Sequence, residues 1–237
     1  MNVTPILEPI LYQKGGNLTN SKLLTTEPIL HRGMNKEECK IICTSSIIPL
    51  REKTFFRLIY ECQLRPFEVM NLEIENWDRN QKMVTAVRVK QKWDNKHKRY
   101  LSSIPRTAIL TDNTNEMIRT LVSNRKKGKI FVNKDGEPFA DLAWFKMQIH
   151  RYATLLSIQK VKKHYVDGRP LHLVTLMGLR EAGERQHDNA GGSRKLSSVA
   201  SGHSMRVKER HYEKVGEDFE QVHDSYRNYH PAFTEGW

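Results

Sequence analysis

Two arginines, a histidine and a tyrosine, contributed by distant parts of the sequence, constrain the fold of this chain more than any other feature. Arg180, His203 and Tyr212 follow one another within residues 171–213, whereas Arg65 lies far upstream, at the end of an apolar run. Side chains so widely separated can act together only if the fold brings both segments to one place. The pattern therefore favours a fold in which the two segments line a common site.

These four side chains suit one chemistry, the attack of a phenol on a phosphodiester. A phenol has a pKa of about 10 and is a weak nucleophile while neutral, so the site must stabilise developing negative charge. Two guanidinium groups can bind the non-bridging oxygens of a phosphate in bidentate fashion. Taken singly, an arginine after a helix is usually a surface charge and a tyrosine usually packs. Their joint spacing favours the catalytic interpretation.

The charge of the chain indicates a polyanionic partner. Its 237 residues, 38% of them hydrophobic and 28% charged, are enough for one large domain or two small ones, and they argue against wholesale disorder. The formal net charge of +12 favours nucleic acid as the partner. A basic protein without such a partner is the alternative, so charge alone decides nothing.

The cysteines do not predict a metal site. Cys39, Cys43 and Cys62 form no CxxC pair, and zinc would need further ligands at suitable spacing. Buried free thiols in a reducing compartment are expected instead. Neither a signal peptide nor an apolar run of membrane-spanning length is present. We therefore expect a cytoplasmic protein that does not enter a membrane.

Helices are expected to dominate the fold. Residues 1–33 mix prolines, glycines and asparagines with short apolar pairs and predict an extended or mobile arm. A helix start is predicted at Asn35, with acidic residues in the first turn. Apolar spacing and turn signals predict further helices at 50–62, 66–72, 113–123, 139–156, 173–189, 194–201, 204–214 and 217–229. Residues 160–170 are predicted to be a basic loop.

One antiparallel hairpin interrupts the helices. Residues 83–91 alternate apolar and polar side chains and predict a strand, 93–96 a turn, and 99–104 the returning strand, which ends before Pro105. Because strand side chains alternate in direction, Arg88, Lys90 and Lys92 share one strongly basic face. The expected fold class is mainly α with a small antiparallel sheet (α+β).

At these residues the chain resembles the tyrosine recombinase (integrase) family. Residues 62–72, CQLRPFEVMNL, match the family segment T-G-L-R-x-S-E-x-x-x-L in register, with Arg65 at its arginine. Downstream, Leu179-Arg180, Ala190-Gly191, Gly202-His203-Ser204 and Tyr212 fall at the family's intervals. The resemblance implies the catalytic-domain fold of these DNA breaking and rejoining enzymes over 34–216, followed by a tail helix at 217–237.

The resemblance implies a role for each of the four residues. Tyr212 is implied to attack the scissile phosphate, giving a covalent 3′-phosphotyrosyl intermediate. Arg65 and Arg180 are implied to stabilise the pentavalent phosphorane, and His203 to contribute a further hydrogen bond. Neither a cofactor nor a metal is implied, since the bond energy is kept in the phosphotyrosine.

Hairpin residues complete the implied site. In the family a hairpin lysine protonates the departing 5′-oxygen; Lys92 is the first candidate and Lys90 the second, although either could be a strand lysine that touches DNA phosphates. Glu68 is a candidate acceptor that buttresses the arginines. Further contacts to DNA are expected from Arg88, Lys96, Lys98 and Arg99.

The chain departs from the family in two places. Met177 replaces the histidine of the family's H-x-L-R, and methionine can neither accept that proton nor donate a hydrogen bond. His172 or His187 could substitute. The segment ahead of residue 34 is also shorter than the helical domain that precedes the catalytic domain in most members, so DNA binding is expected to be weaker or to be completed by another subunit or chain.

The implied partner is double-stranded DNA, bound by a homotetramer that is weakly associated or monomeric without DNA. The tail at 217–237 either exchanges between protomers or folds back on its own domain. Besides a site-specific recombinase or integrase, two functions remain open. A type IB topoisomerase shares this catalytic group and relaxes supercoils as a monomer. The other is a catalytically weakened DNA-binding relative of integrases, in which Met177 replaces the usual histidine.

Overall fold

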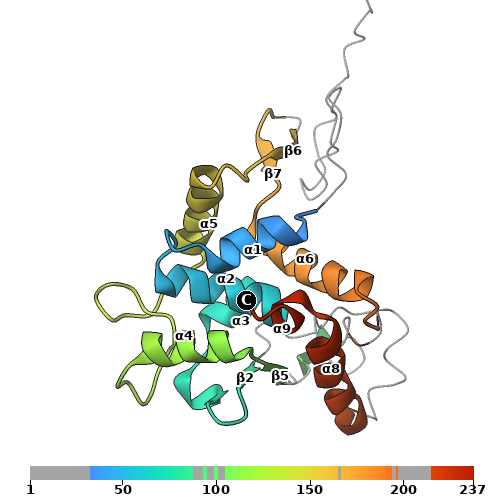
Figure 1. The fold of residues 1–237 in the computed structure, drawn as a ribbon. Helices are drawn as coiled ribbons and strands as arrows, with labels where there is room; N and C mark the ends of the chain where they lie inside the picture. The colour runs from blue at the N-terminus through green and yellow to red at the C-terminus, as the bar shows by residue number, and fades with distance from the viewer. Residues whose placement is uncertain are drawn as a thin grey trace, which may run out of the picture.

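The helix α2 (Leu50–Cys62) lies at the centre of the structure and is buried along most of its length (Figure 1). The computed structural model describes residues 33–87, 93–94, 99–100, 105–164, 167–193, 196 and 215–237. Phe55 of α2 stacks on Phe145, with ring centroids 3.7 Å apart, and meets Phe131 edge to face. The helix predicted at 50–62 is thus confirmed, and a helix buried on nearly all sides is the frame on which others pack.

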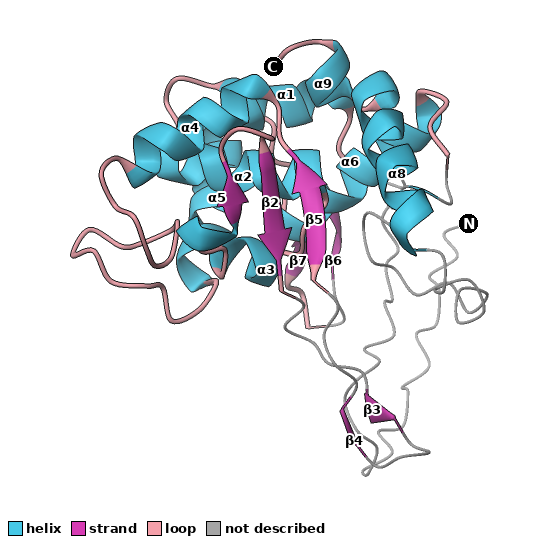
Figure 2. Cartoon of the chain, turned by 90° about the horizontal axis from the view of Figure 1, so that it is seen from below, coloured by secondary structure: helices cyan, strands magenta, loops and turns pink. Residues whose placement is uncertain are grey.

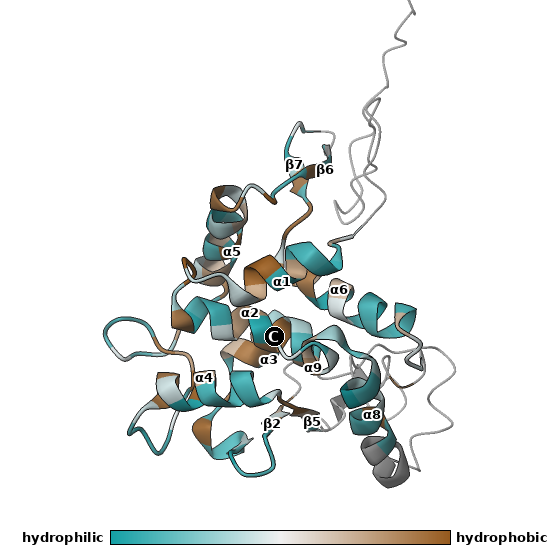
Figure 3. Ribbon diagram, viewed as in Figure 1, coloured by the Kyte–Doolittle hydropathy of each residue, from teal (hydrophilic) through white to brown (hydrophobic). Residues whose placement is uncertain are grey.

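Four helices surround α2: α1 (Lys36–Thr44), α4 (Asp112–Val122), α5 (Ala143–Leu155) and α6 (Leu176–Asn189). The predicted start of α1 is confirmed, because Asn35 and Glu38 form a reciprocal capping box. Cys39 and Cys43 lie on its buried face, and both are free thiols. In Figure 3, hydrophobic and hydrophilic segments alternate along α4, as expected of a helix with one buried face.

Several helices differ from their predicted bounds at the ends, α4 by a single residue at each end. The short α3 (Pro66–Met70) has its proline in the first turn, as predicted, but ends before residue 72. Helix α5 begins four residues after the predicted start, because Asp141 accepts the Ala143 N–H in a turn that precedes the helix. Helix α6 begins only where Thr175 caps it by accepting the Gly178 N–H. Of these ends, the start of α6 is set by a side-chain cap rather than by apolar spacing.

A three-stranded antiparallel sheet packs beside the helices, in the order β1-β2-β5 (Figure 2). Its strands are β1 (Trp77–Asp78), which follows the short helix η1 (Ile74–Asn76), β2 (Met83–Ala86) and β5 (Arg106–Ile109). Of the predicted partner strand at 99–104, only Arg99–Tyr100 is described, and it is a strand (β4); the described pairing of β2 is with β5, beyond Pro105, in the register Ala86 to Arg106.

Two smaller hairpins also differ from the predictions. The strand β3 (Trp93–Asp94) pairs with β4 (Arg99–Tyr100), so the first two residues of the predicted turn at 93–96 are strand. The predicted loop at 160–170 is likewise wrong, because β6 (Val161–His164) pairs with β7 (Pro170–His172). Gly168 supplies a left-handed residue, φ +79°, in the connection. The basic side chains of this segment are typical of a solvated loop, but its backbone pairs with a strand that is close in the sequence.

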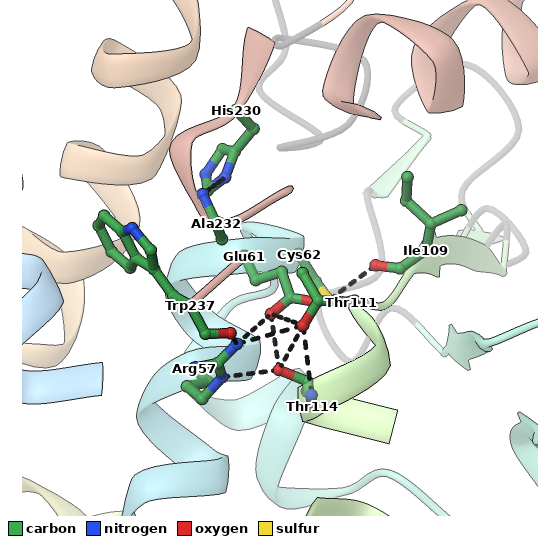
Figure 4. Close-up of polar contacts among 9 residues, drawn as sticks. All are labelled: Arg57, Glu61, Cys62, Ile109, Thr111, Thr114, His230, Ala232 and Trp237. Carbon is green, nitrogen blue, oxygen red and sulfur yellow. Dashed lines mark hydrogen bonds and ion pairs between the residues drawn. The ribbon is translucent and has the colours of Figure 1, made fainter. Parts of the chain in front are cut away.

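The C-terminal tail packs on its own domain in the single chain. It forms α8 (Val215–Tyr229), which overlaps the predicted helix at 217–229, and the unpredicted short α9 (Pro231–Thr234). Tyr226 of α8 stacks on His187 of α6, and the ring of Trp237 stacks on Tyr60 of α2. The backbone oxygen of Trp237 accepts a hydrogen bond of 2.5 Å from Arg57 inside a buried polar network (Figure 4). Exchange of the tail between protomers stays a prediction.

Several predicted elements lie outside the described residues. They are the arm at 1–33, apart from Gly33, and the helices at 194–201 and 204–214, apart from Leu196. Among the helices that are described, none is both long enough and apolar enough to cross a membrane.

Candidate active site

Arg65 lies at the junction between α2 and α3, where its own backbone is held by Glu68. The backbone N–H of Arg65 donates to Glu68 Oε2 at 2.8 Å, and its Nη1 donates to Oε1 at 3.1 Å. The Glu68 side chain is 3% exposed, whereas that of Arg65 is 36% exposed. The buried carboxylate therefore anchors Arg65 on the side that faces the protein interior, while part of the arginine side chain stays at the surface. Glu68 thus has the geometry expected of a buttressing acceptor.

Arg180 approaches the same place from α6 and is almost completely buried. Its Nε donates to the carbonyl oxygen of Gln63 at 2.8 Å. Burial, and then the neighbouring cations Arg65 and Arg106, lower the pKa of Arg180 to about 10. That value still leaves the group a cation near neutral pH, in a setting that favours a bound anion. The structure therefore brings together the two arginines that the sequence places far apart.

Gln63 supplies the acceptor because its backbone is turned. It ends α2 in the left-handed region, with φ 51° and ψ 27°. Its carbonyl oxygen thereby receives hydrogen bonds from two arginines of different segments, Arg180 and Arg106. The Gln63 side chain is fully buried, and its amide atoms have no hydrogen-bond partner among the described residues. The left-handed conformation is strained for a residue other than glycine, and the surrounding structure maintains that strain beside the candidate site.

Arg106 is a third arginine of this cluster, and the sequence analysis missed it. Its Nη2 donates to Glu68 Oε2 at 3.1 Å and to the Gln63 carbonyl oxygen at 3.2 Å. The only sequence signal was an arginine directly after Pro105. That signal could be used only with the true register of β5, which pairs Arg106 with Ala86.

Neither candidate replacement for the missing histidine shows a contact to the arginine cluster within the described structure. His172 lies in β7 with its ring 4.4 Å from that of His150, and burial, followed by His150, lowers its pKa. His187 is fully buried, and its Nε2 lies 2.9 Å from Ser225 Oγ of the tail. Met177 is 44% exposed in the first turn of α6. His187 contacts α8 through Ser225 and Tyr226.

The remaining predicted residues lie outside the part of the chain that the structure describes. They are Tyr212, His203, Lys90, Lys92, Arg88, Lys96 and Lys98; of Arg99, only its place in β4 is described. Tyr226 is described and lies in the electrostatic reach of Arg106, but burial raises its pKa well above the ordinary value. Tyr226 is buried and packs against the rings of His187 and His230.

No group of three or more His, Cys, Asp or Glu side chains that could hold a metal ion occurs in the described ranges. The arginine cluster is cationic. Three guanidiniums converge on one carboxylate and one carbonyl, which is an arrangement suited to a phosphate group.

The fold is that of tyrosine recombinase catalytic domains. XerA recombinase superposes with a TM-score of 0.59 at 15% identity, covering 85% of this chain and 67% of that one. The integrase from mycobacterium phage Brujita gives 0.58 at 12% identity, over 89% and 61%. The Tn1549 transposon integrase, solved with a circular intermediate DNA, gives 0.53 at 12% identity, over 76% and 60%. The chain thus spans about 60–67% of the length of these relatives.

The profile of the phage integrase family matches residues 34–168. The chain belongs to the phage integrase family. The matched segment contains Arg65, Glu68 and Arg106 and ends before Arg180, so the second arginine is placed by the fold alone. No curated protein sequence matches the chain. Family and fold together support a role in site-specific recombination.

Proposed function

We propose that this protein is a site-specific DNA recombinase or integrase that cleaves and rejoins DNA through a covalent 3′-phosphotyrosyl intermediate. The observation that carries the proposal is the convergence of Arg65 and Arg180 on neighbouring acceptors, Glu68 and the Gln63 carbonyl oxygen, in a member of the phage integrase family. Two guanidiniums from distant segments, held a hydrogen bond away from a shared support, can bind the non-bridging oxygens of one phosphate.

In the proposed reaction the phenol oxygen of Tyr212 bonds to phosphorus and releases its proton to solvent, while the bond from phosphorus to the 5′-oxygen breaks. Arg65 and Arg180 offset the charge that develops on the non-bridging oxygens, and His203 adds a hydrogen bond. A hairpin lysine, Lys92 or else Lys90, gives a proton to the leaving 5′-oxygen. Attack by a 5′-hydroxyl of a partner strand then reverses these steps and frees the tyrosine.

Double-stranded DNA is the proposed substrate. The net charge of +12 supports it, and the similar Tn1549 transposon integrase was solved in complex with a circular intermediate DNA. We further propose that protomers assemble as a tetramer on DNA, with basic hairpin residues Arg88, Lys96, Lys98 and Arg99 contacting the backbone.

Covalent trapping tests the proposal and selects the recombination site in the same experiment. Duplexes with randomised sequence and a nick are incubated with the protein, and DNA that remains attached after denaturation is recovered and sequenced. The nick lets the short fragment that carries the new 5′-hydroxyl diffuse away, so the intermediate accumulates. We expect the unaltered protein to yield an enriched sequence and Tyr212→Phe to yield no adduct, because the phenylalanine ring has no oxygen to form the bond.

Each other outcome points to a different function or residue. An adduct that persists in Tyr212→Phe refutes the assigned nucleophile. Binding without any adduct supports the weakened DNA-binding relative, in which Met177 has removed the proton acceptor. Relaxation of supercoiled plasmids that lack the enriched sequence supports the type IB topoisomerase.

A further inference from the structure

We propose that Arg106 is a positioning residue of this site, which holds the two candidate catalytic arginines in place relative to β5, the strand that follows the hairpin. The inference rests on the proposed function, since it assigns a residue to that reaction. Nη2 of Arg106 donates both to Glu68 Oε2 and to the Gln63 carbonyl oxygen, at 3.1 and 3.2 Å. Those two acceptors are the ones that hold Arg65 and Arg180.

The shared acceptors make the three arginines interdependent. The Glu68 carboxylate accepts hydrogen bonds from both Arg65 and Arg106, and the Gln63 carbonyl oxygen accepts from both Arg180 and Arg106. Movement of Arg106 therefore changes the partners of both other guanidiniums at once. The arrangement is a bridge in which one nitrogen of Arg106 spans the acceptor of Arg65 and the acceptor of Arg180.

The electrostatics of the cluster agree with such a role. Arg65 and Arg106 both lower the pKa of Arg180, whereas Glu68 and Glu184 raise it. Three cations thus face two carboxylates in the described structure, and the cluster keeps a net positive charge. A phosphodiester would offset that charge. Arg106 contributes to this field although its side chain is only 11% exposed, so it is poorly placed for a direct contact to DNA.

The place of Arg106 in the chain links the cluster to the hairpin. Arg106 pairs with Ala86 at the end of the β2–β5 ladder, and residues 87–105 connect these two positions. The candidate general acids, Lys90 and Lys92, belong to that connecting segment. A guanidinium at its base that bonds Glu68 and Gln63 fixes the origin of the hairpin relative to Arg65 and Arg180. Relative placement of an acid and two phosphate-binding groups governs the rate of the chemical step.

The test compares the chemical step with binding in Arg106→Gln, Arg106→Lys and the control Arg119→Gln. Arg119 lies on α4 with its side chain 55% exposed, so its substitution removes the same charge from the surface. At saturating DNA we expect Arg106→Gln to form the covalent adduct about 10²-fold more slowly, and Arg106→Lys, which keeps the charge without the planar fork, about tenfold more slowly. The Kd for DNA should stay within about threefold in both, and the control should keep the unaltered rate.

A rate equal to that of the unaltered protein in Arg106→Gln, or a loss confined to Kd, overturns the assignment. If Arg106→Gln does not fold, Arg106→Lys decides, and an unaltered rate in that variant overturns it. If the unaltered protein forms no adduct, the proposed function fails, and hydrogen exchange at Nε of Arg180, followed by ¹⁵N NMR, tests Arg106 by itself. Exchange about tenfold faster in the substituted protein supports the bridge, and unchanged exchange refutes it.

Discussion

At the scale of single residues, the backbone of Gln63 matters more than its side chain. Its left-handed conformation costs a residue with a Cβ roughly 1–2 kcal/mol, and its buried amide lacks partners among the described residues. What the site uses is the carbonyl oxygen, which accepts from Arg180 and Arg106. In the family segment that this stretch matches, glycine occupies the position, which is the residue that the left-handed region favours.

Gln63→Gly and Gln63→Val separate these two contributions. Glycine relieves the backbone strain and the buried amide while it loses apolar contacts, so we expect the free energy of unfolding to change by less than about 1 kcal/mol. Valine is β-branched and is poorly tolerated at positive φ, so we expect a loss of about 2 kcal/mol or more.

Urea unfolding measures both changes, and the rate of adduct formation reports whether the carbonyl oxygen stays in place. We expect Gln63→Gly to retain the rate and Gln63→Val to lose it. Equal behaviour of the two variants would show that the turned backbone has no special role.

At the scale of elements, the end of the tail completes a buried charge network of α2. Arg57 donates to Thr114 at 2.7 Å and to the Trp237 backbone oxygen at 2.5 Å, and it lies 3.6 Å from Glu61. Burial raises the pKa of Glu61, while Arg57 and the threonine hydrogen bonds oppose that rise. Removing one partner from such a network is costly, because charges remain buried without full compensation. The tail is therefore part of the folded domain, whichever protomer provides it.

Trp237→Ala should lower the free energy of unfolding by about 3 kcal/mol, because the ring is buried against Tyr60. Tyr229→Ala is the matched control: this aromatic residue of the same tail is 40% exposed, and we expect a loss below about 1 kcal/mol. Calorimetry of the free protein measures both. If the tail is exchanged between protomers, Trp237→Ala will also weaken assembly on DNA, whereas loss of stability with unchanged assembly would mean that it stays on its own domain.

At the scale of the whole molecule, the net charge of +12 should dominate non-specific DNA binding. Neutralising 6–10 phosphates releases enough counterions to lower affinity by about 10³–10⁵ between about 50 and 200 mM salt. Fluorescence anisotropy with a labelled duplex of arbitrary sequence measures this dependence. Arg106→Gln should leave the slope of log affinity against log salt concentration unchanged, because Arg106 is nearly buried. A slope that changes by about one phosphate contact would mean that Arg106 binds DNA directly.

The sequence predicts the helices of this molecule better than its strands. Helices with strong apolar spacing and a capping side chain, such as the one that follows Asn35, form nearly as predicted because their signals are local. The β6–β7 hairpin was missed because its basic side chains resemble those of a solvated loop. The strand β5 was not predicted because Pro105 looked like the end of a strand rather than the residue before one.

Some residues of the candidate site could likewise be predicted from the sequence, and others could not. Arg65, Glu68 and Arg180 could be found from spacing and from the resemblance, and the structure places them together. Arg106 could not be found, since its importance depends on the register of two strands and on a turned carbonyl. The roles of Tyr212, His203 and the hairpin lysines stay predictions.

Because one carbonyl oxygen at the end of α2 serves guanidiniums delivered by β5 and by α6, the phosphate-binding geometry exists only when all three elements have docked. A partly folded chain would lose the whole arrangement rather than a fraction of it. If the protein cuts DNA as proposed, a half-assembled molecule would be inactive, because it would lack the site for the phosphate.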